Sequence, residues 1–288
     1  LFELSKEHKT FSISEIISCL KGEKISFDII EENENVLILK SEEKKKIKNI
    51  FERLSYTYYV NYFLFSCKPD LKIVEEYALD NKVDIKGTVA IKYNNRSRKI
   101  DSREIVKVLA GIYTENREVD LENPDNEIRA LITDSKIYVG LKLIKIDRTQ
   151  FEKRKVQFRP FFSPISLHPK IARVLVNLSC VRKKETLLDP FCGTGGILIE
   201  AGLIGINVIG ADIEQKMVEG SKQNLEYYDI KDYNFFISDI GSIKDSIRKV
   251  DSVVTDFPYG KSTTTKGEDM EKLYSRAFES ISGVLKEN

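Results

Sequence analysis

Short apolar runs alternate with amphipathic stretches along the second half of the chain. Runs rich in β-branched and large apolar residues predict strands at residues 186–189, 207–212, 234–238 and 251–256. Helical periodicity occupies the stretches around and between them, including 169–182, 197–203 and 270–285. Because strands that alternate with helices favour crossover connections, this half is predicted to form a parallel, doubly wound sheet of the α/β class.

The first half carries shorter and less regular elements, typical of an α+β arrangement. Strands are predicted at residues 2–4, 27–30, 36–39, 58–65, 88–93, 128–132 and 137–146. Helices are predicted at 13–20, 42–54, 71–79 and 103–113, and Asp101 and Ser102 are candidate N-caps for the last of these. Between the halves, residues 149–169 are polar and basic and contain three prolines, which indicates a linker.

Composition narrows the class of protein. The chain has 288 residues, 41% hydrophobic and 32% charged, which suits a globular protein of two or three compact units. No apolar run reaches the roughly 18 residues that cross a bilayer, and residues 1–10 lack the apolar stretch of a signal peptide, so we expect a cytoplasmic protein without membrane association. Four scattered cysteines and two histidines predict neither a metal site nor a disulfide framework.

Positive charge is concentrated locally, although the net charge is only +1. Six basic residues against Asp101 stand in residues 86–103, and seven basic against two acidic residues stand in residues 142–159. Such blocks suit phosphate binding, but they also occur on ordinary solvated faces. The candidate RNA-binding residues, just before and at the start of a predicted helix, are Lys92, Arg96, Arg98, Lys99 and Arg103.

A glycine loop follows the first predicted strand of the α/β half. The segment D-P-F-C-G-T-G-G at residues 189–196 joins that strand to a helix, where glycines let the backbone approach a ligand. A dinucleotide fingerprint would need glycine where Leu198 stands, so NAD is disfavoured. Acidic residues also end the next two strands, at Asp212 and Asp239. The predicted cofactor-binding residues are Asp189, Pro190, Gly193, Thr194, Gly195, Asp212, Ile213, Asp239 and Ile240.

The fourth predicted strand ends in T-D-F-P-Y-G at residues 255–260. An exocyclic amino group of a nucleobase is a poor nucleophile, and acceptors aimed at its hydrogens help to hold its electron density toward an incoming methyl group. The Asp256 carboxylate and the Phe257 carbonyl would be those acceptors, with Pro258 fixing the turn and Tyr259 offering a face to an unstacked base. These four residues are the predicted catalytic set.

Residues 186–260 resemble class I methyltransferases of the amino-methylating group, whose signature is D/N-P-P-Y. The segments R-P-F-F at 159–162 and P-K-I-A-R-V-L-V-N-L at 169–178 are similar to tRNA guanosine N2-methyltransferases, and V-D-L-E-N-P-D at 119–125 is similar to THUMP domains. D-F-P-Y-G followed by K-S-T looks closest to the archaeal family that modifies tRNA guanosine at position 10.

The resemblance implies a fold, a cofactor and a substrate. It implies an N-terminal ferredoxin-like domain (residues 1–48), a THUMP domain (49–148) that grips the tRNA acceptor end, a linker (149–162) and a Rossmann-like methyltransferase domain (163–288) that continues in the family through three further strands. The cofactor would be S-adenosylmethionine and the product N2-methylguanosine or its dimethyl form. The enzyme would act as a monomer or with an activator subunit.

One departure keeps other functions open. The family has proline where this chain has Phe257, so a tRNA-binding protein without catalysis is an alternative. Another is methylation of a different amino group, such as guanosine at position 6 of tRNA or an adenine N6.

Overall fold

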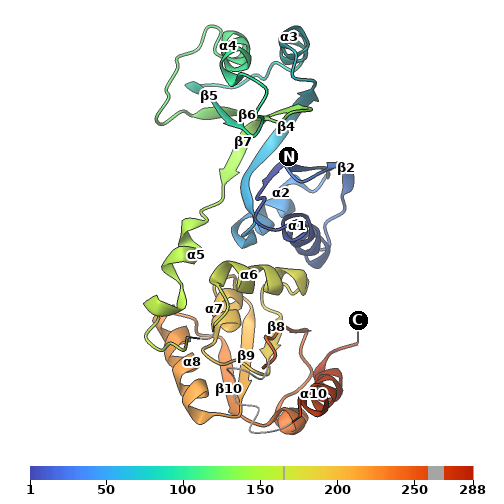
Figure 1. The fold of residues 1–288 in the computed structure, drawn as a ribbon, viewed down its shortest axis with the longest axis vertical. Coiled ribbons are helices and arrows are strands. Elements are labelled where there is room, and N and C mark those ends of the chain that lie inside the picture. Colours follow the sequence, from blue (N-terminus) through green and yellow to red (C-terminus); the bar gives the residue numbers. More distant parts are fainter. Residues whose placement is uncertain (165, 259–268, 288) are drawn as a thin grey trace. The chain divides into compact units, whose positions relative to one another are not determined.

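The structure is a computed structural model that describes residues 1–164, 166–258 and 269–287. It divides into two compact units (Figure 1). The first contains residues 1–7, 28–40 and 57–146, and the second contains residues 8–27, 41–56 and 147–288. The chain therefore passes repeatedly from one unit to the other before residue 147.

The first unit is built on one seven-stranded sheet. Its order is β2-β3-β1-β4-β7-β6-β5, and β5 and β6 form its parallel pair. The strands are β1 (Phe2–Leu4), β2 (Asp28–Glu32), β3 (Val36–Lys40), β4 (Thr57–Cys67), β5 (Val89–Asn95), β6 (Asn126–Ile132) and β7 (Ile137–Lys145). The strands predicted separately in residues 2–39 and 58–146 thus share one sheet, because β1 pairs with β4.

Two helices cover the β4-β7-β6-β5 part of this sheet on one face (Figure 1). Helices α3 (Leu71–Asp80) and α4 (Ser102–Tyr113) begin at Asp70 and Asp101, whose carboxylates accept backbone N–H bonds as predicted for Asp101. Their apolar sides pack on the sheet through residues such as Val74 and Leu109, which are fully buried. This burial is the main source of stability for a helix of such length.

The second unit contains the predicted parallel sheet, in the order β10-β9-β8-β11. Its strands are β8 (Thr186–Asp189), β9 (Asn207–Asp212), β10 (Tyr233–Ile237) and β11 (Ser252–Val253). Helices α6 (Pro169–Leu178), α7 (Gly196–Gly202) and α8 (Gln215–Tyr227) share a core with Leu187 and Val208. Helices α9 (Ile243–Ser246) and α10 (Met270–Val284), with the 3-10 turn η3 (Ile240–Ser242), share another with Leu188 and Ile209. Successive strand residues face opposite sides, so both faces are covered.

Helical segments from the N-terminal region complete this second unit. Helix α1 (Phe11–Gly22), helix α2 (Lys44–Ile47) and the 3-10 helix η1 (Lys48–Arg53) belong to it, so the single helix predicted at 42–54 is divided in two. Glu15 of α1 is fully buried and accepts hydrogen bonds from the Ser55 hydroxyl (2.6 Å) and the Asn177 amide of α6 (2.9 Å). Asn177 Oδ1 in turn accepts from Arg53 Nε. These buried polar groups form one connected hydrogen-bond network, and this network holds α1, η1 and α6 together.

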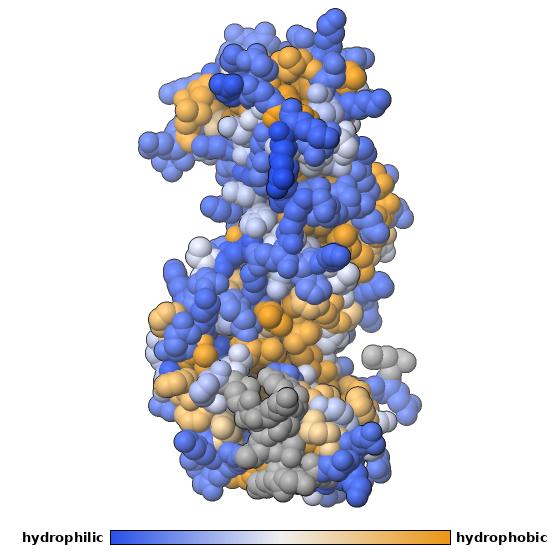
Figure 2. Space-filling model, in the orientation of Figure 1, coloured by the Kyte–Doolittle hydropathy of each residue, from blue (hydrophilic) through white to orange (hydrophobic). Residues whose placement is uncertain are grey.

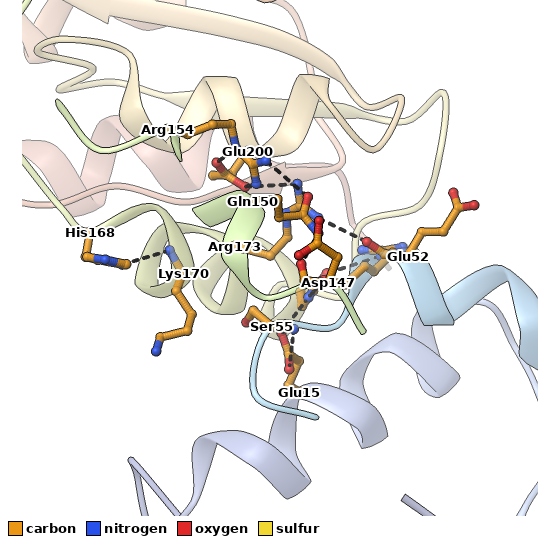
Figure 3. Close-up of polar contacts among 12 residues, drawn as sticks. Glu15, Glu52, Ser55, Asp147, Gln150, Arg154, His168, Lys170, Arg173 and Glu200 are labelled. Carbon is orange, nitrogen blue, oxygen red and sulfur yellow. Dashed lines mark hydrogen bonds and ion pairs between the residues drawn. The ribbon is translucent and has the colours of Figure 1, made fainter. Parts of the chain in front are cut away.

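The predicted linker is not extended. It contains helix α5 (Thr149–Lys153) and the 3-10 turn η2 (Val156–Phe158). Arg154 donates two hydrogen bonds to the buried Glu200 of α7 (2.7 and 2.9 Å), and Arg173 of α6 forms an ion pair with the same carboxylate (2.9 Å; Figure 3). The interpretation of residues 142–159 as a phosphate-binding block is therefore wrong for Arg154 and Arg159, both buried inside this unit.

Two histidines lie at helix starts. His8 and His168 accept backbone N–H bonds at the starts of α1 and α6. In the part of the chain that the structure describes, no helix is both long and apolar enough to cross a bilayer.

We expect Glu200→Gln to lower the free energy of unfolding by about 3–5 kcal/mol, because it leaves two buried guanidinium groups without a counter-charge. Glu152→Gln is the matched control: Glu152 also pairs with a cation, Lys155, but its side chain is 56% exposed, so we expect a change of no more than about 0.5 kcal/mol. Urea unfolding followed by circular dichroism measures both. Equally small changes in unfolding free energy for the two variants would show that the Glu200 charge is not required for stability.

Candidate active site

The predicted acidic strand ends meet at one edge of the parallel sheet. β8 lies between β9 and β11, so Asp189 at the end of β8 has the end of β9, Asp212, on one side and residues 254–256 on the other. Asp239 follows β10, next to β9. The carboxyl edge of such a sheet is where open α/β folds bind ligands, which makes this edge the candidate site.

The glycine loop has the conformation that its sequence predicts. Gly193 (φ 50°) and Gly195 (φ 75°) both lie in the left-handed region, which side chains disfavour. Among the described residues, a methyl group placed on Gly193 would meet no heavy atom within 4 Å apart from its chain neighbours, so these residues leave space beside the backbone there. Asp212 holds the loop: its carboxylate accepts from Gly193 N (3.0 Å) and from Glu214 N (2.9 Å), and burial raises its pKa.

Asp189 is the most deeply buried carboxyl group of the site, with 2% of its surface exposed. Its Oδ1 accepts from the Thr255 hydroxyl (2.6 Å) and from Phe191 N (3.2 Å). Desolvation raises the pKa of Asp189 to about 7, against the lowering effect of those hydrogen bonds, and the charges of Asp212 and Asp256 raise it further. Asp189 is therefore a buried anchor for the start of the glycine loop.

Asp239 has a partner that the sequence does not reveal. Arg276 of α10 donates to both of its carboxylate oxygens (2.7 and 3.1 Å), and Gly241 N donates to Oδ1 (2.8 Å). The hydrogen bond from Arg276 lowers the pKa of Asp239. Its side chain remains 37% exposed, so an acceptor position can still face a ligand.

The turn after β11 is anchored by aromatic packing. Phe257 lies 5.4 Å from Phe191, 5.0 Å from Tyr274 and 5.6 Å from Phe278, measured between ring centroids. The Tyr274 hydroxyl donates to the Pro258 carbonyl (3.1 Å). Asp256 is accessible, and desolvation by its surroundings raises the pKa of its carboxyl. Tyr259 lies outside the described residues, so the predicted stacking face stays a prediction.

Polar side chains that local sequence patterns did not mark also support the glycine loop. The Ser221 hydroxyl of α8 donates to Gly193 O (2.6 Å), and the Asn224 amide donates to Thr194 O (2.9 Å) and Phe161 O (2.8 Å). Ser166 bonds the Thr194 hydroxyl (2.9 Å). Both α8 residues are fully buried. Polar residues on the apolar face of α8 were the available signal, since buried polar groups need partners.

The remaining predicted cofactor residues differ in accessibility. Pro190, Thr194 and Ile240 are buried, whereas Ile213 is exposed beside Asp212. Ile213 is therefore accessible to a ligand, whereas the three buried residues contribute to packing beneath the carboxyl edge of the sheet.

Similarity to known proteins identifies the family of this chain. A family model described as UPF0020, RMKL-like, methyltransferase domain, matches residues 156–288. A tRNA (guanine(10)-N2)-dimethyltransferase of Methanothermobacter thermautotrophicus is 36% identical over 99% of this chain and 84% of its own length. The chain belongs to this tRNA (guanine(10)-N2)-dimethyltransferase family. The Pyrococcus abyssi member is 38% identical over 89% of this chain and 77% of its own length.

The fold agrees with that of other methyltransferases. The crystal structure of TrmN from Thermus thermophilus superposes with a TM-score of 0.51, covering 91% of this chain and 78% of that one at 17% identity. This likeness shows that the protein has a mixed α/β fold with a methyltransferase-like sheet.

The predicted RNA-binding residues of this family member lie in the first unit and differ in their surroundings. Arg96 is half-buried and donates to Asn35 Oδ1 (3.1 Å) and Leu4 O (2.8 Å), so it holds the sheet together. Lys92 donates to Leu121 O, and Arg103 pairs with Asp101. Arg98 and Lys99 are exposed, which makes them the stronger candidates for RNA contact.

We expect Asp189→Asn to change how stability depends on pH. A folded-state pKa raised from 3.8 to about 7 means that this group stabilises the fold at low pH, and that the contribution is lost as pH rises from about 4 to about 7. The unfolding free energy of the variant minus that of the unmutated protein should therefore rise across this range, by up to ~1.4 kcal/mol per pH unit.

Urea unfolding at several pH values measures this difference. Asp229→Asn, at a side chain 86% exposed, is the control and should give a flat difference. Parallel curves for Asp189→Asn would contradict the buried, proton-holding carboxyl group.

Proposed function

We propose that this chain transfers methyl groups from S-adenosylmethionine to the N2 amino group of guanosine 10 in tRNA, once or twice. The observation that carries the proposal is the position of Asp256. It directly follows Thr255, whose hydroxyl donates a hydrogen bond to Asp189, and the glycine loop begins at Asp189. An acceptor for amino hydrogens is thereby placed next to a loop built for a ligand. The relatives named above supply the nucleotide position.

The site has the features that S-adenosylmethionine needs. The described residues leave space beside Gly193, and the Asp212 oxygens, each with one N–H donor, keep acceptor positions for ribose hydroxyls. Ile213 offers an apolar contact to a purine ring, and Asp239 an acceptor for its amino group. When bound, the cofactor supplies a methyl group activated by its sulfonium charge.

The residues of the chain then orient the base and manage its protons. The Asp256 carboxylate and the Phe257 carbonyl would accept hydrogen bonds from the two N2 hydrogens, which keeps the nitrogen directed at the methyl group. Each methyl gained costs the nitrogen one proton, and Asp256 is placed to hold it before it passes to water. Tyr259 would stack on the base.

The THUMP domain, residues 49–148, would hold the acceptor end of tRNA, and residues 1–48 would form the ferredoxin-like domain. These proposed bounds do not coincide with the two compact units, because residues 8–27 and 41–56 belong to the second unit. Apolar side chains also gather on the face of the second unit drawn in Figure 2, and Phe158 and Phe162 are exposed at 57% and 62%. The Phe161 backbone shares Asn224 with the glycine loop, so the exposed ring of the next residue, Phe162, is the better placed of the two to meet an unpaired base. The cytoplasmic location and the activator subunit stay predictions.

We expect Asp256→Asn to lower the rate of methyl transfer by about 10²–10³-fold, because the amide presents only one acceptor oxygen without the charge. tRNA affinity should stay within about twofold. Full-length protein, tRNA and cofactor are incubated, and digested tRNA is read by mass spectrometry. Asp229→Asn is the control.

The product identifies the reaction. N2-methylguanosine or its dimethyl form at position 10 supports the proposal. N2-methylguanosine at position 6, or N6-methyladenosine, would instead support one of the alternative methyltransferase functions. tRNA binding without any methyl transfer by the unmutated protein would favour a binding protein.

We expect Arg98→Ala combined with Lys99→Ala to weaken tRNA binding and to reduce the slope of log affinity against log salt by roughly 1.4–1.8, since each of the two lost phosphate contacts removes about 0.7–0.9. Titrations at several salt concentrations measure the slope. Lys231→Ala with Lys222→Ala, a basic pair on the second unit, is the control. An unchanged slope would remove this loop from the interface. Arg96→Ala, in contrast, should chiefly reduce stability.

A further inference from the structure

A side-chain hydrogen bond joins the ends of the neighbouring strands β8 and β11 at the candidate site. β11 has only two ladder residues, Ser252 and Val253, paired with Leu187 and Leu188 of β8. A backbone bond from Val254 N to Leu188 O (3.0 Å) extends the ladder toward the site, and one from Asp251 N to Thr186 O (3.0 Å) extends it at the other end. Beyond Val254, the Thr255 hydroxyl donates to Asp189 Oδ1 at 2.6 Å. This bond extends the connection of the strands to the residue immediately before Asp256.

The two residues joined by this bond lie next to the two parts of the proposed site. Asp189 precedes the glycine loop and is almost fully buried, so it offers a fixed anchor. Thr255 is β-branched, which restricts its side-chain rotation, and it is covalently followed by Asp256. Neither the backbone N–H of Gly193 nor the Asp212 carboxylate takes part in the bond.

We propose that Thr255 is a positioning residue: its hydroxyl, held by Asp189, sets the distance and direction from the cofactor loop to the Asp256–Phe257 acceptors. The inference rests on the proposed function and deepens it. Catalysis by alignment is sensitive to small displacements, and misplacement by about 1 Å can cost about 10²-fold in rate. Gly193 and Asp212 take no part in this bond, and Asp189 keeps its hydrogen bond from Phe191 N when the Thr255 hydroxyl is removed, so we expect ground-state binding to change little.

Thr255→Val and Thr255→Ser separate this role from simple stability. Valine keeps the shape and branching but cannot donate, whereas serine keeps the hydroxyl. For the valine variant we expect kcat to fall about 10–100-fold, with KM for S-adenosylmethionine and for tRNA within about threefold of the unmutated values. The serine variant should retain kcat within about threefold. Thr186→Val, at the opposite end of β8, is the matched control and should leave kcat unchanged.

A second measurement does not depend on methyl transfer. Amide hydrogen exchange of the peptide spanning residues 252–258 should be faster in Thr255→Val than in the unmutated protein and in Thr255→Ser, since the strand end is released. Exchange elsewhere in the sheet, such as in β9, should stay the same.

The outcomes distinguish this inference from the proposed function. If the unmutated protein transfers no methyl group, the proposed function fails, and the exchange experiment still tests the bond. If Thr255→Val keeps its kcat, if serine is as slow as valine, or if exchange rises equally throughout the sheet, Thr255 is structural only and the inference is overturned. A fall in both kcat and cofactor affinity would likewise contradict a pure positioning role.

Discussion

A carboxylate that water does not reach holds the catalytic half together. Glu200 lies on α7, the helix that begins directly after the glycine loop, and its charge is balanced by Arg154 of the linker segment and Arg173 of α6. Removing one partner from such a buried group is strongly unfavourable, so the three segments are stable only together. The position of the glycine loop is therefore fixed from behind, while its open side stays available for a ligand. The same helix α6 extends this rigid body through Asn177 to Glu15.

Local sequence patterns identified most helices and strands of both units, because each element buries one face and therefore carries its own periodicity. The acidic strand ends could be predicted for the same reason, since parallel strands place their carboxyl ends together. Pairing between distant segments leaves no such local signal. The strand pairing that unites β1 with β4 and the Arg276 partner of Asp239 both depend on the folded chain. Charge runs were the weakest guide, since Arg96 and Arg154 hold structure in place.

Phe257 illustrates how packing can replace a covalent restraint. In the family pattern a proline precedes Pro258, and its ring limits the backbone directly. Here a cluster of Phe191, Tyr274 and Phe278 surrounds the Phe257 ring, and the Tyr274 hydroxyl binds the next carbonyl. Helix α10 thus supports the turn from the side. The altered motif therefore keeps a packed turn after β11.

The repeated passage of the chain between its units has a consequence for biosynthesis. Helix α1 leaves the ribosome early, yet α6, against which Glu15 finds its partner, follows more than a hundred residues later. Until then Glu15 lacks its Asn177 partner, and α1 cannot pack against α6. The catalytic half therefore matures only after most of the chain has been translated, and the nascent polypeptide has to be protected from aggregation in that interval.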